Sequence, residues 1–226
     1  MTKRALVVID LQEDFLPPNG SLAIQDGRTI VPAINELLCE SELKKWDLVV
    51  ASQDWHPANH TSFASQHAVS PFTELEFQNP ETGETKTQVV WPDHCIQGTH
   101  GACFAPSFAN KLEKVQNGAI SKAVVIKKGY LQDREYYSCF QDSWGLHHTE
   151  MKSVLETNKI DEAVFVGLAY DYCVMHSAID CAKSGFKTYV VKSLCKSVDP
   201  EKINDTDEMY RINGVIIVDS ISEIID

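Results

Sequence analysis

Six short apolar segments along the chain have the character of buried β-strands. They are rich in Val and Ile and almost continuously apolar, as strands covered on both faces of a sheet should be. The predicted strands are Ala5–Ile9, Leu48–Ala51, Ala123–Ile126, Ala163–Val166, Thr188–Val191 and Val215–Val218.

Helix-like segments lie between most of these strands. The first segment is expected to carry one apolar helical face, marked by Ile30, Ile34, Leu37, Leu38 and Leu43. The third segment ends at Ser184-Gly185, where glycine suits the left-handed position that follows a helix. The predicted helices are Ile30–Lys45, Thr149–Thr157, Tyr172–Ser184 and Asp199–Ile212.

The alternation of strands and helices predicts an α/β fold of three layers, α/β/α. Repeated strand–helix–strand units favour a doubly wound parallel sheet of six strands with helices on both faces. We expect residues 1–226 to form one domain, because the chain shows no internal repeat and no low-complexity segment. Residues 54–117 are the exception to the alternation, with much of the Pro, His, Trp and Gly and no strand-like run longer than Gln88–Trp91. So long an irregular insertion in a compact domain is usually functional.

Composition and charge narrow the classes of function. Of the 226 residues, 43% are hydrophobic and 23% are charged, as in an ordinary globular protein. Twenty basic and 32 acidic residues give a net charge of −12, which argues against nucleic acid or an anionic membrane as a partner. No apolar run approaches the roughly 18 residues of a membrane span. A homo-oligomer is compatible with the sequence.

Cysteine content and the chain ends lead to an expectation about the compartment. Seven cysteines, an odd number at irregular spacing, occur without a secretion signal. Reduced thiols in the cytoplasm are the simplest interpretation. The C-terminal Ile224-Ile225-Asp226 resembles no peroxisomal or endoplasmic-reticulum address, so presence in the nucleus or peroxisome would require association with another protein.

Polar and reactive residues follow four of the predicted strands. Asp10 follows the first strand, Asp54 and His56 the second, Lys128 the third, and the stretch 167–173 the fourth. In sheets of this kind, ligands bind outside the carboxyl ends of the strands, near the switch in strand order. The convergence of these four strand ends predicts a catalytic site.

Cys173 is the candidate nucleophile, because it lies between a strand and the helix that follows. A thiol at a helix N-terminus feels the positive end of the helix dipole, which favours the thiolate. Backbone amides of the same turn could hold a developing oxyanion. We interpret five other cysteines as buried structural residues: Cys39, Cys103, Cys139, Cys181 and Cys195.

Asp10 and Lys128 are the candidate partners of this thiol. A carboxylate at the end of a buried strand is costly unless it is paired or used, and Asp10 could take the thiol proton and return it to a leaving amine. A structural cap is the alternative role for Asp10. Lys128 could pair with Asp10, and of the two lysines it is preferred over Lys127 because it adjoins Gly129.

The insertion contains candidate metal ligands. Asp54 and His56 are two residues apart and so lie on the same side of an extended segment. His94, from the other arm of the insertion, would complete a set of three that leaves positions open for water or substrate, as catalytic sites do. A carboxylate with imidazoles suits Zn²⁺, and also Fe²⁺ or Mn²⁺. His60 is an additional candidate ligand, left open by the sequence.

Together these residues resemble the nicotinamidases of the isochorismatase-like cysteine hydrolase family, over nearly the whole chain. The motifs that carry the resemblance occur in the family's order: Val8–Phe15; Asp54–Pro57 with His60 and Ser62-Phe63; Trp91–Cys95 with Gly98-Thr99 and Gly101-Ala102; Lys128-Gly129; and Gly167–Ala169 with Asp171 and Cys173-Val174. The stretch Asp133–Ser138 and the long insertion are similar to the fungal branch.

The resemblance implies the role of each candidate. It implies Asp10, Lys128 and Cys173 as a catalytic triad and Asp54, His56 and His94 as ligands of one divalent metal ion. It implies a cis peptide between Leu168 and Ala169 that turns the amides of Ala169 and Cys173 toward an oxyanion. The residues implied to bind substrate are Phe15, Trp91, Tyr137, Leu168, Ala169 and Tyr172.

The implied reaction is hydrolysis of nicotinamide, and also of pyrazinamide, through a thioester on Cys173. Nicotinic acid and ammonia would be the products, within NAD salvage, and the metal would bind the pyridine nitrogen. One rival hypothesis is an amidase of the same fold that acts on ureido or carbamoyl substrates, which would not need the three metal ligands. Another is a catalytically idle binding protein, which would not need an intact triad.

Overall fold

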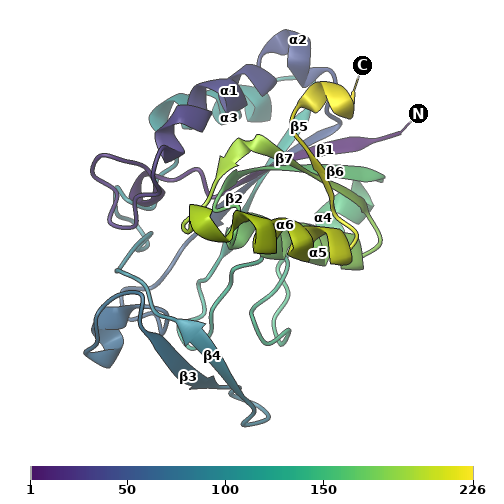
Figure 1. The fold of residues 1–226 in the computed structure, drawn as a ribbon. Helices are drawn as coiled ribbons and strands as arrows, with labels where there is room; N and C mark the ends of the chain where they lie inside the picture. Colours follow the sequence, from purple (N-terminus) through teal and green to yellow (C-terminus); the bar gives the residue numbers. More distant parts are fainter. Residues whose placement is uncertain (1, 226) are drawn as a thin grey trace.

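The six apolar runs pair side by side into one sheet at the centre of the computed structural model, which describes residues 2–225 (Figure 1). The strand order is β5–β2–β1–β6–β7–β8, and every neighbouring pair is parallel. The strands are β1 Arg4–Ile9, β2 Leu48–Asp54, β5 Lys122–Lys128, β6 Glu162–Leu168, β7 Lys187–Lys196 and β8 Ile216–Val218. Each predicted strand overlaps an observed one, so the predicted parallel sheet is confirmed.

Successive residues of the central strand β1 enter two different hydrophobic cores. Leu6 and Val8 belong to the core on one face, and Ala5, Val7 and Ile9 belong to the core on the other. All five side chains are fully buried. Burial on both faces explains why the strand is apolar at every position instead of alternating with polar residues.

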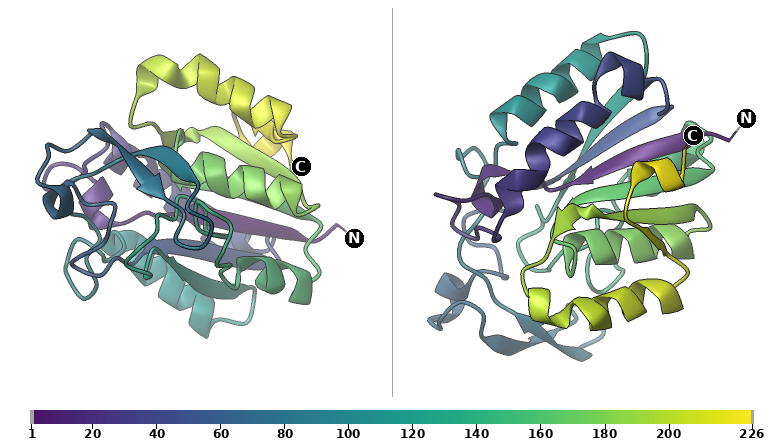
Figure 2. Two further views of the ribbon diagram at one scale, coloured as in Figure 1. Left: turned by 90° about the horizontal axis from the view of Figure 1, so that it is seen from below. Right: turned by 45° about the horizontal axis from the view of Figure 1, so that its top comes forward.

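Helices cover both faces of the sheet and make the predicted three layers (Figures 1 and 2). One face carries α1 Ile30–Leu37, α2 Glu40–Leu43 and α3 Pro106–Asn117, and the other carries α4 Met151–Thr157, α5 Cys173–Lys183 and α6 Ile203–Ile212. Short 3-10 helices are η1 Glu13–Phe15, η2 Gly27–Thr29, η3 Ala64–His67, η4 Pro200–Lys202 and η5 Ile221–Glu223. The α/β/α architecture is thus confirmed.

The first predicted helix, Ile30–Lys45, is wrong as a single element. The chain leaves the helical conformation at Cys39 (φ −71°, ψ 152°) between α1 and α2. The Cys39 carbonyl then accepts hydrogen bonds from the amides of Glu42 and Leu43. The break allows Leu43 and Trp46 to enter the same core as α1, which a straight helix would not permit.

The insertion 54–117 is more regular than predicted. It contains a hairpin of β3 Glu74–Gln78 and β4 Thr85–Val89, which projects from the body of the molecule (Figure 1). The insertion also ends earlier than predicted, because α3 Pro106–Asn117 is a covering helix of the sheet. Proline fits the first helical turn, where no backbone donor is needed. Phe108, Leu112 and Val115 then recur at helical spacing and are buried.

None of the helices in residues 2–225 combines the length and hydrophobicity that crossing a bilayer requires.

Candidate active site at the carboxyl ends of the strands

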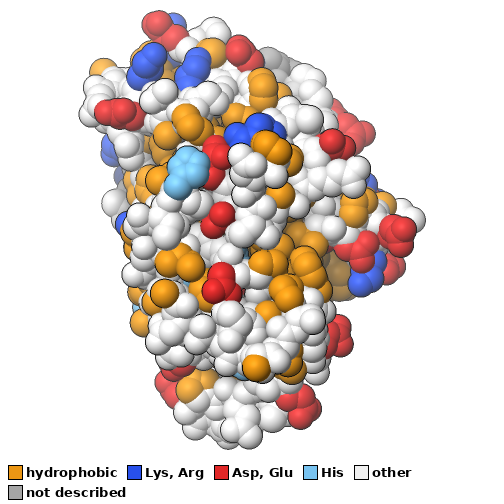
Figure 3. Space-filling model, turned by 90° about the vertical axis from the view of Figure 1, so that its left-hand side faces the viewer, with side chains coloured by type: hydrophobic (Ala, Val, Ile, Leu, Met, Phe, Trp, Pro, Cys, Tyr) orange, Lys and Arg blue, Asp and Glu red, His pale blue; other side chains and the backbone are white. Residues whose placement is uncertain are grey.

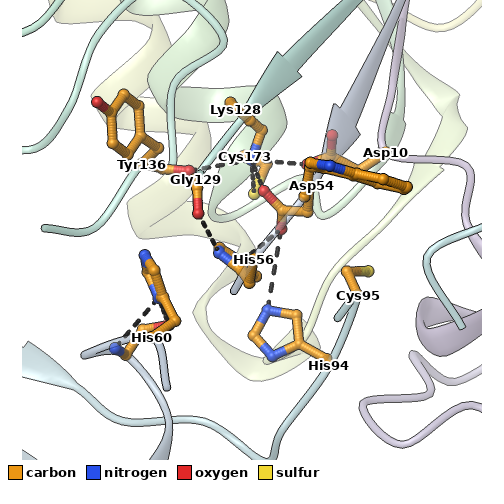
Figure 4. Close-up of polar contacts among 12 residues, drawn as sticks. Asp10, Asp54, His56, His60, His94, Cys95, Lys128, Gly129, Tyr136 and Cys173 are labelled. Carbon is orange, nitrogen blue, oxygen red and sulfur yellow. Dashed lines mark hydrogen bonds and ion pairs between the residues drawn. The ribbon is translucent and has the colours of Figure 1, made fainter. Parts of the chain in front are cut away.

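Four strand ends meet where the strand order changes direction. The chain builds outward from β1 to β2 and β5, then returns to the other side of β1 with β6. Asp10 follows β1, Asp54 ends β2, Lys128 ends β5, and Cys173 begins α5 after β6. Figure 3 looks onto this edge of the sheet, where apolar and acidic side chains lie together. The structure therefore brings together all the residues predicted to do chemistry (Figure 4).

Lys128 is fully buried at the centre of this cluster. Its Nζ lies 2.9 Å from Asp10 Oδ2 and donates hydrogen bonds to Asp54 Oδ1 (2.6 Å), the Tyr136 carbonyl (3.0 Å) and Cys173 Sγ (3.4 Å). Burial opposes its positive charge, but the two carboxylates outweigh burial and hold the pKa of Lys128 well above its usual range. Lys128 is therefore a fixed cation that joins the nucleophile to the metal-ligand candidates.

The alternative lysine, Lys127, is excluded from the site by its position. It is exposed, and its Nζ lies 3.7 Å from the centre of the Trp55 ring, in a cation–π contact. Successive side chains of a strand point to opposite sides, so only one of the two lysines can face the cluster. The preference for Lys128 agrees with the structure.

Asp10 is placed to exchange a proton. Its Oδ1 accepts a hydrogen bond from Ser52 Oγ (2.6 Å). Its Oδ2 lies close to the Lys128 ammonium, but no group of residues 2–225 donates to it with hydrogen-bond geometry. Burial raises the pKa of Asp10, and Lys128 offsets this only in part. A buried carboxylate with a raised pKa, whose Oδ2 is ion-paired with Lys128 but accepts no hydrogen bond from the described residues, is a suitable proton acceptor. This geometry favours a catalytic role over a structural cap.

The surroundings of Cys173 disfavour the thiolate that its helix position led us to expect. Burial raises the pKa of the thiol well above its usual range; Lys128 counteracts this, whereas the Asp10 carboxylate adds to it. Burial thus opposes the thiolate that the helix N-terminus favours. The thiol needs a base, and ligand atoms of Asp10, Asp54 and Cys173 all lie within 4.8 Å of one another.

Three predicted metal ligands converge beside this cluster. Asp54 Oδ2 lies 3.5 Å from His56 Nε2 and 3.8 Å from His94 Nε2. Ligands bound at about 2.0–2.2 Å around one zinc ion lie roughly 3–4 Å apart, so the spacing suits a shared cation. His56 Nε2 is buried and has no hydrogen-bond partner among the described residues, which leaves it free to bind a metal.

Neighbouring groups orient these ligands. His56 Nδ1 lies 2.8 Å from the Gly129 carbonyl, and His94 Nδ1 lies 2.7 Å from the Pro92 carbonyl. A carbonyl can only accept, so each Nδ1 carries the proton and each Nε2 offers its lone pair, the arrangement usual for metal-binding histidines. Burial lowers the pKa of His94 to about 4, which keeps its imidazole neutral. The three residues fit a divalent metal ion.

His60, which the sequence left open, lies next to the set but is engaged elsewhere. Its ring is tilted by 37° against that of His56, with 4.2 Å between centroids. Nδ1 lies 2.7 Å from Ser62 Oγ, and Nε2 lies 3.0 Å from the Arg134 carbonyl. Both ring nitrogens already have hydrogen-bond partners, so His60 packs against the metal-ligand candidates and is not itself free to bind the metal.

An aromatic pocket opens beside Cys173, Asp54 and His94. Trp91 packs edge-on against Tyr172 at 4.9 Å between centroids, and its Nε1 donates to the Tyr137 hydroxyl (3.2 Å). The predicted substrate residues that line the pocket are Phe15, Trp91, Tyr137, Ala169 and Tyr172. Leu168 does not line this pocket and its side chain is buried in the core, so its role in binding substrate stays a prediction.

The turn that carries Cys173 also offers backbone donors. The Leu168–Ala169 peptide is cis, as the resemblance implied. The amides of Ala169 and Cys173 donate no hydrogen bond to another group of residues 2–225. Two free amides beside a nucleophile can stabilise an oxyanion.

The structure adds pocket residues that the prediction missed: Leu22, Ile24, Glu135, Tyr136 and Val198. Glu135 is the most polar of them. Burial raises its pKa, and one of its oxygens accepts a hydrogen bond from the Tyr136 amide (2.8 Å). Its position seven residues after Lys128, in a stretch with several charged and aromatic residues, was the available sequence signal.

Comparison with known proteins agrees with this geometry. The model of the isochorismatase domain matches residues 4–220. The chain belongs to the isochorismatase family. It is 34% identical to a nicotinamidase of Saccharomyces cerevisiae over 96% of this chain and 99% of that protein. It is also 38% identical to a nicotinamidase of Escherichia coli over 88% of this chain and 85% of that protein.

Two solved structures extend the comparison. The yeast nicotinamidase bound to the inhibitor nicotinaldehyde superposes with a TM-score of 0.89 at 33% identity, over 96% of this chain and all of that one. A pyrazinamidase of Pyrococcus horikoshii in complex with zinc has a TM-score of 0.72 at 30% identity, over 96% of this chain and 99% of that one. These relatives therefore indicate that the chain is a hydrolase that acts on amide C–N bonds.

Proposed function

We propose that this protein is a nicotinamidase, which hydrolyses nicotinamide to nicotinic acid and ammonia in NAD salvage. One observation carries the proposal: a thiol, a carboxylate and a lysine lie next to three candidate metal ligands, beside a pocket lined with aromatic side chains. The thiol, carboxylate and lysine suit attack on an amide, and the aromatic pocket suits a flat ring. The relatives that are nicotinamidases or pyrazinamidases support this substrate class.

The reaction begins with the Cys173 thiol. Asp10 takes the thiol proton as the sulfur attacks the carboxamide carbon, while Lys128 stabilises the negative charge between them. The amides of Ala169 and Cys173 hold the oxyanion. Asp10 then gives the proton to the amide nitrogen, the C–N bond breaks and ammonia leaves.

The second half of the reaction regenerates the thiol. A water molecule gives a proton to Asp10 and attacks the thioester carbon. The C–S bond breaks, nicotinic acid forms, and Cys173 recovers its proton. Asp10 thus acts once as an acid and once as a base in each half, which its raised pKa allows.

Asp54, His56 and His94 would hold the divalent metal ion, for which zinc is our proposal and iron or manganese the alternatives. When bound, the metal supplies a Lewis acid that a ring nitrogen can contact. The pyrazinamidase structure in complex with zinc supports this assignment. The ureido or carbamoyl rival has no use for these ligands, and their intact geometry favours the nicotinamide hypothesis.

Ammonia release from three amides tests the proposal. Nicotinamide and pyrazinamide carry a ring nitrogen meta to the carboxamide, whereas benzamide has none. We expect the metal-loaded protein to hydrolyse the first two far faster than benzamide, because the ring nitrogen positions the carbonyl over the thiol. Stripping the metal, or His94→Ala, should shrink this gap by slowing mainly nicotinamide.

The matched variant is Cys173→Ala, which should lose turnover and keep nicotinamide binding. Equal hydrolysis of nicotinamide and benzamide by the metal-loaded protein would refute the assignment of the substrate. Retained turnover in Cys173→Ala would refute the assignment of the nucleophile. Location in the cytoplasm remains a prediction, and so does a homo-oligomer, which light scattering of the purified protein would test.

A further inference from the structure

A second pair of reactive side chains lies on the opposite edge of the sheet. Cys39 lies between α1 and α2, and Lys111 lies within α3. Lys111 Nζ is 3.1 Å from Cys39 Sγ, although the two residues are 72 positions apart. The contact is made where α1 packs against α3. Because α2 leads directly into the start of β2, this pair is at the amino edge, away from the pocket of Cys173 (Figures 1 and 2).

The surroundings of Cys39 differ from those predicted for a structural cysteine. Its thiol is partly exposed, whereas Cys95, Cys139, Cys173, Cys181 and Cys195 are all buried. It lies in a hollow of about 360 Å³ that Lys111 and Lys114 also line. Reactive cysteines occupy such partly exposed positions beside lysine side chains. The Cys39 thiol also donates a hydrogen bond to the Glu36 carboxylate (3.4 Å).

We propose that Cys39 and Lys111 form a reversible covalent sulfur–nitrogen bond when a peroxide oxidises the thiol. In the first step the sulfur attacks one oxygen of hydrogen peroxide. The O–O bond breaks, the sulfur loses two electrons and becomes a sulfenic acid, and one water is released. Sulfenic acids condense with nearby thiols or nitrogens.

In the second step the Lys111 nitrogen, after it loses a proton to solvent, attacks the sulfenic sulfur. The S–N bond forms, the S–O bond breaks, and the hydroxyl leaves as water with a second proton from the nitrogen. Peroxide is the only oxidant consumed, and the linked pair has two hydrogens fewer than the separate residues. A thiol reductant reverses the link by attack on the same sulfur.

Cys103 provides the comparison within the same chain. Cys103 is exposed, unlike the buried structural cysteine that was predicted, and its Sγ donates to the Thr99 carbonyl at 3.5 Å. No amine of the described residues lies within hydrogen-bond distance of it, so its sulfenic acid has no nitrogen to attack it. Cys103 should therefore be oxidised without forming a cross-link.

Peptide mapping of the full-length protein after peroxide treatment tests the proposal. We expect a linked pair of peptides with Cys39 and Lys111, lighter by two hydrogens than their sum and separated by a thiol reductant. Cys103→Ser and Lys114→Arg should retain this link. Lys111→Arg keeps the positive charge but offers no amine, so the link should be lost.

A probe specific for sulfenic acid gives an independent readout. In wild type the Lys111 nitrogen consumes the sulfenic acid, so labelling of Cys39 should be weak and should rise several-fold in Lys111→Arg. Equal labelling of Cys39 in both proteins, or the absence of a linked peptide in wild type, would overturn the proposal. A link to Lys114 instead of Lys111 would also overturn it. The link should raise the urea midpoint of unfolding, because it closes a long loop.

Discussion

Gly129 connects the end of β5 to the metal-ligand set, and its substitution by alanine should damage that set selectively. A Cβ on Gly129 would lie 2.3 Å from His56 Cε1 and 2.6 Å from Nδ1. The same glycine has a φ of +72° and offers the carbonyl that accepts the His56 Nδ1 proton at 2.8 Å. Gly129→Ala would therefore displace the His56 ring and disturb the bond that orients it.

Two separate effects set the magnitude. A non-glycine residue in the left-handed conformation costs about 1–2 kcal/mol of stability. Disturbing a group that orients a metal ligand typically lowers metal affinity about 10–100-fold. Gly98 isolates the first effect, since its φ is +76° but, apart from its own chain neighbours, no atom of residues 2–225 lies within 4 Å of an added Cβ.

The assay compares Gly129→Ala with Gly98→Ala. Gly98→Ala should lose about 1–2 kcal/mol in the free energy of unfolding of the metal-free protein, measured with urea, and Gly129→Ala should lose more, because it also displaces the buried His56 ring. Only Gly129→Ala should lose zinc affinity, by about 10–100-fold in competition with a chelator. Equal zinc affinity in the two variants would refute the reasoning, because the His56 ring would then not depend on Gly129.

Two other substitutions give independent checks. Asp10→Asn cannot carry a proton, so it should fold and bind metal yet lose about 10²–10⁴-fold in turnover of nicotinamide; half of wild-type activity would return Asp10 to a structural role. Burial opposes ionisation of Glu162, but hydrogen bonds from Lys187 and Arg4 outweigh it and lower its pKa below 4.5. The stabilisation by ionised Glu162 is thus present above pH 4.5 and is lost as the pH falls through the lowered pKa. Urea unfolding from pH 7 to about pH 3 should show this loss in wild type and in the exposed control Glu208→Gln. Glu162→Gln should not show it.

The position of the candidate site could be predicted from the sequence because strand ends are marked in it. Buried parallel strands are apolar at every position, so a charged residue that ends one stands out, as Asp10 does after Ile9. Parallel strands place their carboxyl ends on one edge, and this rule brings distant residues together without any model of the loops. The fold class followed from the same apolar runs.

Other features depended on packing that the sequence does not display. Strand β4 is mostly polar and exposed and lacks the alternation that identifies a half-buried strand. Strand β3 does alternate polar and apolar residues, but over only five positions within an irregular segment, and the prediction missed it. Helix α3 did carry a signal, Pro106 followed by Phe108 and Leu112, but it was hidden within an irregular segment. The protonated state of Cys173 depends on how completely other elements bury it.

The register of the sheet itself builds the contact between the two halves of the site. In the pairing of β2 with β5, Asp54 lies opposite Lys128 and Gln53 opposite Lys127. Paired residues on neighbouring strands point to the same side, so the ammonium of Lys128 meets the Asp54 carboxylate. A slip of one residue would bring Lys127 opposite Asp54 and turn Lys128 away from Asp10 as well. A single backbone alignment therefore positions the lysine for both the metal-ligand set and the nucleophile, and neither half of the site can form correctly without it.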